Sequence, residues 1–74
     1  MKEHIKKILE EALPLVNLDS DFLFSELDSL GVATILMKLS DEYAVKLDSS
    51  DATPMNLKNL DSLVALVERK LSDK

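Results

Sequence analysis

The 74-residue sequence contains no cysteine and a single histidine, His4. Without cysteine the chain can form no disulfide, no thiolate metal site and no cysteine nucleophile, which fits a reducing cytoplasm. A catalytic triad or a histidine-based zinc site would have to be built on His4 alone. Asp19-Ser20-Asp21 lacks the glycine and the glutamate that complete a calcium loop. We therefore expect neither catalysis nor a metal site.

Glycine, proline and aromatic residues are also scarce. One glycine, two prolines, one tyrosine and two phenylalanines leave little material for hairpin turns and strands, so helices are expected. No apolar run approaches the ~20 residues that span a bilayer, and no membrane insertion is expected. Because ordinary domains have ~100 to 200 residues, residues 1–74 are predicted to form one small domain.

Positive charge is in deficit, with 9 basic against 14 acidic residues and a net charge of −5. Nucleic-acid affinity depends largely on contacts with phosphate groups, which repel an acidic surface, so nucleic acid is not an expected partner. Hydrophobic residues make up 46% of the chain and charged residues 31%. This balance is typical of a folded domain with a core.

The apolar spacing predicts three main helices. The first runs over Lys2–Leu13 and stops before Pro14, which disfavours helix in the residue preceding it. The second runs from about Leu30 to Tyr43, and the last begins after a predicted N-cap, Asn59. The stripe of the last helix consists of Leu60, Leu63, Val64, Val67 and Leu71.

The segments between these helices have weaker patterns. Residues 15–28 show no sustained period and are expected to form a long loop pinned on the core. Thr53-Pro54 provides an N-cap followed by a proline at N1, which predicts a single short helical turn through Leu57. Together the patterns predict an all-α fold, a small antiparallel bundle of three main helices plus one short helix.

The tripeptide Asp28-Ser29-Leu30 lies where the long loop enters the second helix. A phosphodiester on a serine at this place would lie beside free backbone N–H groups and the positive end of the helix dipole. Asp28 or Ser29 could equally serve only as a helix cap. The same tripeptide recurs around Ser62, which is expected to be an ordinary polar residue in the first turn of the last helix.

The order helix, long loop, helix, short turn and helix, with Asp28-Ser29-Leu30 at the second helix, resembles the acyl carrier protein family over essentially the whole chain. The stretch from Thr53-Pro54-Met55-Asn56 onward resembles the turn and last helix of many free-standing carriers. The resemblance implies that Ser29, next to Asp28, carries a covalent 4'-phosphopantetheine arm holding acyl or aminoacyl thioesters. It implies as partners a phosphopantetheinyl transferase, acyl-loading or adenylating enzymes and downstream synthases, acting on a monomer.

Glu26, Gly31 and Thr34 depart from carriers of bacterial fatty-acid synthesis, which usually have a glycine, an acidic residue and a glutamate there. The second helix has no carboxylate between Leu30 and Leu39. The sequence therefore predicts a nearly neutral partner surface. Its apolar residues are Leu30, Ala33 and Met37, and the charges left for electrostatic steering are Asp28, Asp41 and Glu42.

This apolar pattern looks more like carriers that serve adenylating enzymes of amino-acid or peptide type. It favours a specialised fatty-acid, polyketide or peptide-type pathway. A different class of function stays open at this point: a small acidic helical adapter that binds proteins without any covalent arm.

Overall fold

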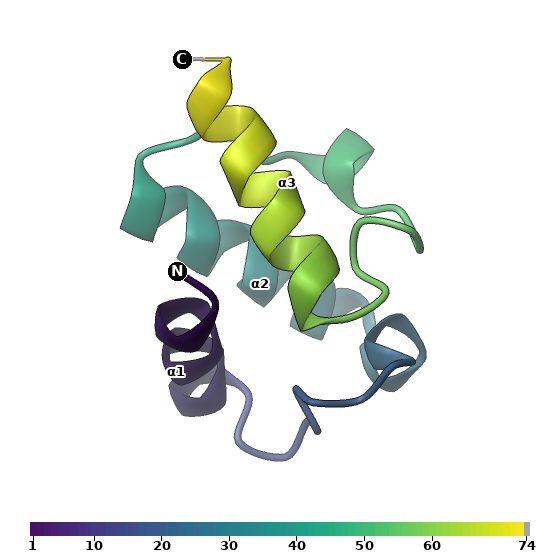
Figure 1. Ribbon diagram of the computed structural model, residues 1–74. Helices are drawn as coiled ribbons and strands as arrows, with labels where there is room; N and C mark the ends of the chain where they lie inside the picture. The colour runs from purple at the N-terminus through teal and green to yellow at the C-terminus, as the bar shows by residue number, and fades with distance from the viewer. Residues whose placement is uncertain (74) are drawn as a thin grey trace.

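Three α-helices contact one another in the computed structural model, which describes residues 1–73 (Figure 1). They are α1 (Lys2–Ala12), α2 (Ser29–Tyr43) and α3 (Leu60–Ser72). In Figure 1, α1 and α3 run in opposite directions and α2 crosses behind α3. Residues 1–73 form no strand, and the predicted all-α fold is confirmed. No helix in this range is long and apolar enough to cross a membrane.

The helix ends follow local chemistry. α1 stops one residue before the predicted end, because Leu13 leaves helical geometry ahead of Pro14. The predicted cap of α3 is confirmed, since Asn59 Oδ1 accepts a hydrogen bond from the Ser62 amide at 2.9 Å. The three apolar stripes meet in one core. Its fully buried helical residues include Ile5, Leu9, Ile35, Leu39, Leu63 and Val67.

The loop between α1 and α2 is more ordered than its sequence suggests. It contains a 3-10 helix, η1 (Leu23–Glu26), and buries Leu18 and Leu23 in the core. The Leu23 amide donates a hydrogen bond of 2.8 Å to the Lys58 carbonyl. This bond joins the segment before α2 to the segment before α3, so the approach to α2 is fixed by a contact distant in sequence.

The single helical turn predicted at Thr53-Pro54 is confirmed, and the Thr53 hydroxyl caps it by accepting a hydrogen bond of 3.1 Å from the Asn56 amide. Residues 53–57 form one turn, in which the Leu57 amide bonds to the Thr53 carbonyl at 3.0 Å, but no helix follows. The turn cannot continue because Asn59 adopts an extended conformation as the N-cap of α3. A second short element that the sequence did not predict lies earlier in this connection, the 3-10 helix η2 (Ser49–Asp51).

α2 ends at Tyr43, and the following C-cap residue, Ala44, adopts a left-handed conformation with φ 52° and ψ 44°. This geometry is unfavourable for any residue with a Cβ, and glycine is its usual occupant. We expect Ala44→Gly to raise the free energy of unfolding by about 0.5 to 1 kcal/mol in urea titrations. The exposed Ala65, inside α3, is the control, and Ala65→Gly should lower it by about 1 kcal/mol. If both substitutions lowered the free energy of unfolding, the assignment of strain to Ala44 would be contradicted.

Candidate functional site

The N-terminus of α2 is built around the Asp28 carboxylate. Asp28 has extended backbone geometry, and its Oδ1 accepts a hydrogen bond of 2.7 Å from the Gly31 amide. Its carbonyl accepts a further bond from the Val32 amide at 3.0 Å. Asp28 is therefore the N-cap of α2, and Ser29 is the first residue inside the helix.

The Ser29 side chain is exposed, and its hydroxyl makes no hydrogen bond within residues 1–73. The amides of Ser29 and Leu30 belong to the first turn, where N–H groups have no acceptor inside the helix. These amides and the helix dipole favour an anion near the hydroxyl. The position thus combines access for a modifying enzyme with a favourable site for a phosphate group.

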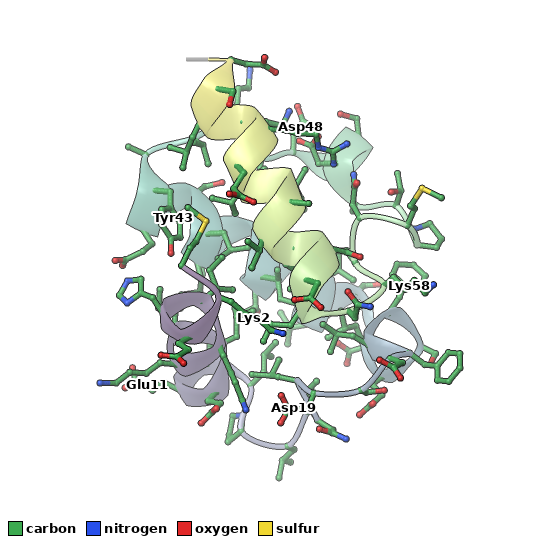
Figure 2. All side chains as sticks on the ribbon, viewed as in Figure 1. Lys2, Glu11, Asp19, Tyr43, Asp48 and Lys58 are labelled. Carbon is green, nitrogen blue, oxygen red and sulfur yellow. The ribbon has the colours of Figure 1, made fainter. Side chains whose placement is uncertain are left out.

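Ser62, in the second copy of the tripeptide, has a different environment. Its amide and its hydroxyl both donate to Asn59 Oδ1, at 2.9 and 3.0 Å, and the residue is half-buried. The preceding Asp61 pairs with Lys2 at 2.8 Å, and Figure 2 shows Lys2 beside the lower half of α3. The hydroxyl of Ser62 is therefore part of the helix cap, whereas that of Ser29 is free.

A groove of about 680 Å³ lies beside Ser29. α2 and the two segments that flank it in the sequence each contribute one wall. The lining residues are Phe24, Leu27, Asp28, Ser29, Val32, Ala33, Leu36, Met37, Leu47, Ser49 and Ala52. Sequence reasoning missed the walls outside α2, because large apolar residues in irregular segments look the same whether they fill a core or line a groove.

The wall that contains Ser49 is stiffened by hydrogen bonds at both ends of η2. Asp48 Oδ1 accepts from the Ser50 amide at 3.0 Å, and Asp51 Oδ2 accepts from the Asp48 amide at 3.1 Å. Hydrogen bonds from the Ser50 hydroxyl and amide lower the pKa of Asp48 below its ordinary value. The carboxylate therefore stays ionised, and this cap intact, until the solution is more acidic than the usual range of aspartate.

The three apolar residues predicted to face partners lie together on one exposed face of α2. Leu30 is 74% exposed and Met37 is 53% exposed, with Ala33 between them. Their spacing of three and four residues places them in one row. Ala33 and Met37 also line the groove, so the row and the groove share an edge.

The three predicted steering acids do not form a cluster. Asp28 lies at the first turn of α2 and caps it, whereas Asp41 and Glu42 lie at the opposite end. Glu42 Oε2 contacts His4 Nε2 of α1 at 2.7 Å. Asp41 is exposed and makes no ion pair within the described part of the chain. Within residues 1–73, Asp41 is thus the one of the three acids whose side chain makes neither a hydrogen bond nor an ion pair.

Gly31, one of the departures from fatty-acid carriers, does not lie on the exposed surface of α2. Gly31 is buried, and a Cβ placed on it would lie 3.2 Å from Asp28 Oδ1 and 3.3 Å from Leu27 Cδ2. Helical spacing alone could not show this, because the loop before α2 folds back over that side of the helix. Of the departures within α2, Thr34 is the one that reaches the surface, as a half-buried residue.

The comparisons with known proteins identify one family. A family model described as "Phosphopantetheine attachment site" matches residues 1–67, which include α1, α2 and the first part of α3. No curated protein and no solved structure matches the chain significantly.

Gly31→Ala should test the crowding at the start of α2. Alanine is favoured over glycine by about 1 kcal/mol inside a helix. Here the new methyl group would press on a carboxylate that is held by the Gly31 amide itself. We expect Gly31→Ala to leave the free energy of unfolding unchanged or to lower it. In an Asp28→Ala background, the same substitution should raise the free energy of unfolding by the helix preference of alanine. A full gain in the otherwise unchanged chain, measured by urea unfolding, would refute this account.

Proposed function

Because the chain belongs to the phosphopantetheine attachment-site family, we propose that Ser29 is the residue that carries the arm. Membership of this family means a non-catalytic carrier domain with a covalent 4'-phosphopantetheine. It also means that a phosphopantetheinyl transferase and loading enzymes act on the chain. The resemblance that the sequence suggested is thus confirmed at the level of the family.

The free hydroxyl at the start of α2 is the observation that carries the proposal. Ser29 is exposed and unbonded within residues 1–73, whereas the hydroxyl of the rival Ser62 is bonded to Asn59. The amides of Ser29 and Leu30 are available to a phosphate at this position. The Asp28 carboxylate, which would repel that phosphate, is hydrogen-bonded to the Gly31 amide.

When attached, the arm supplies a thiol that holds acyl or aminoacyl groups as thioesters. The chain's own contribution is the groove, which begins at Ser29 and is lined mainly by apolar side chains from Phe24 to Ala52. Apolar cargo in this groove would be removed from water, a favourable transfer of roughly 25 cal/mol per Å² of apolar surface. We therefore assign apolar acyl cargo to the groove.

The surface of α2 favours a specialised fatty-acid, polyketide or peptide-type pathway. Leu30, Ala33 and Met37 present an apolar row, and no carboxylate lies on α2 before Asp41. A basic enzyme surface would gain little electrostatic steering from it, whereas an apolar surface would bury Leu30 and Met37 favourably. We infer that enzymes with an apolar docking surface load this chain, and that the chain works as a monomer in the cytoplasm. The absence of cysteine fits that compartment.

Ser29→Ala should abolish attachment of the arm, because no other serine combines an exposed hydroxyl with the start of α2. The chain is incubated with coenzyme A and a phosphopantetheinyl transferase of broad specificity, and its intact mass is measured. Ser62→Ala is the matched control and should gain the mass of one arm. Attachment to Ser29→Ala would refute the site. If the unmodified chain gained no mass, the rival function as a protein-binding adapter would be favoured instead.

Thr34→Glu should restore steering towards basic enzyme surfaces. Thr34 lies one turn after Leu30, whose carbonyl accepts its hydroxyl at 2.8 Å. We expect the arm-bearing variant to accept malonyl groups from a fatty-acid malonyl transferase about two- to fivefold faster at low ionic strength, and no faster at high salt. Thr34→Gln, similar in size but uncharged, should not change the rate. Malonyl loading of the unmodified chain as fast as that of a fatty-acid carrier would contradict the specialised pathway.

A further inference from the structure

One wall of the groove beside Ser29 is held in place by the last turn of α3. Leu47, Ser49 and Ala52 belong to the connection between α2 and α3, residues 44–59, and they form this wall. Unlike the residues of α2, they are not part of an α-helix, so their position depends on contacts to other segments. Leu47 and Ala52 pack against the core, and the polar contacts with α3 converge on Asp51, at the end of η2.

The Asp51 carboxylate makes two contacts with different oxygens. Oδ2 accepts a hydrogen bond from the Asp48 amide and closes η2, while Oδ1 lies 3.1 Å from Lys70 Nζ on α3. The Asp51 side chain is 14% exposed, the lowest value for any acid in the four ion pairs of residues 1–73. Attraction in this pair is therefore screened less by water and salt than in the other pairs.

A second bridge reaches the same residue from α3. The Asn56 side-chain amide donates to the Asp51 carbonyl at 3.0 Å, and Arg69 Nη2 donates to Asn56 Oδ1 at 2.7 Å. Arg69 and Lys70 are the basic residues of the last turn of α3. We call Asp51, Asn56, Arg69 and Lys70 the η2 anchor. In Figure 2, Asp48, at the start of η2, lies beside the upper half of α3.

The other end of the wall makes longer hydrogen bonds than the η2 anchor. The amides of Val45 and Leu47 bond to the Ser40 carbonyl and hydroxyl at 3.3 and 3.2 Å, which are long hydrogen bonds. Between them and α2 lies Ala44 with its unfavourable left-handed backbone. A backbone change at Ala44 would relieve strain, so the wall can move at this end more easily than at the η2 anchor.

We propose that Asp51 is a positioning residue, which through Lys70 fixes η2 and limits the length of cargo that the groove can shelter. The inference rests on the proposed carrier function and identifies what regulates the same site. Widening the groove for a longer acyl group moves η2 relative to α3, and this movement stretches the 3.1 Å contact between Asp51 and Lys70. Short cargo needs no such movement.

The test compares butanoyl and dodecanoyl thioesters on the arm-bearing chain, by the rate at which hydroxylamine cleaves each. Lys70→Gln should slow cleavage of the dodecanoyl group about two- to fivefold, the range expected for a partly exposed ion pair, and leave the butanoyl rate unchanged. Lys70→Arg, which keeps the cation, should behave as the unmodified chain. Lys58→Gln removes an exposed cation from the same connection that makes no ion pair within residues 1–73, and it should have no effect.

Amide hydrogen exchange on the arm-free chain provides a second readout, independent of the carrier function. The amides of Asp51 and Ala52 bond to the carbonyls of Asp48 and Ser49, and they should exchange faster in Lys70→Gln than in Lys70→Arg or Lys58→Gln. Equal exchange in the three variants, or equal effects on the two thioesters, would overturn the proposal. A failure to attach the arm would count against the proposed function, whereas the exchange result would still decide whether the η2 anchor holds the wall.

Discussion

The first turn of α2 determines which side chains of this helix lie at the attachment site, in the groove and on the exposed apolar row. The Asp28 carboxylate bonds to the Gly31 amide, so the chain passes from extended geometry at Asp28 into helix at Ser29. This places one unbonded hydroxyl beside free amides at the positive end of the helix. A helix has 3.6 residues per turn, so a start shifted by one residue would put a different side chain in this place. The capping bond thus sets the register on which the groove, the apolar row and the proposed attachment site all depend.

α2 is apolar on more than one side, which is unusual for a helix at the surface of a globular protein. Ile35 and Leu39 are buried in the core, Val32 and Leu36 line the groove, and Leu30 reaches solvent. In so small a domain, a helix that lines a groove contributes fewer residues to the core, so other segments must complete the core. The irregular segments do so, with Leu18, Leu23 and Leu57.

Four of the fourteen acidic residues join separate segments of the chain, and α2 has no carboxylate before Asp41. Each ion pair connects two parts of the chain, and an exposed pair adds no more than about 1 kcal/mol to stability. Their effect is on placement, since they align α1 with α2 and α3, and η2 with α3. The pairs are Lys2 with Asp61, Lys6 with Asp19, and Asp51 with Lys70, and the contact between His4 and Glu42 joins α1 to α2 in the same way. A net charge of −5 is therefore compatible with a nearly neutral recognition face.

The sequence by itself determined the helices, the Asn59 cap and the special place of Asp28-Ser29, because these depend on residues within about one helical turn of one another. Only the tertiary structure decided which sides of α2 stay open. Leu27 folds back and covers Gly31, and the groove takes its walls from three separate segments. Likewise Glu42 contacts His4, and Asp51 contacts Lys70, although the two members of each pair are far apart in the sequence. Helical period and capping act between near neighbours, whereas these contacts exist only once the loops have closed and brought distant segments together.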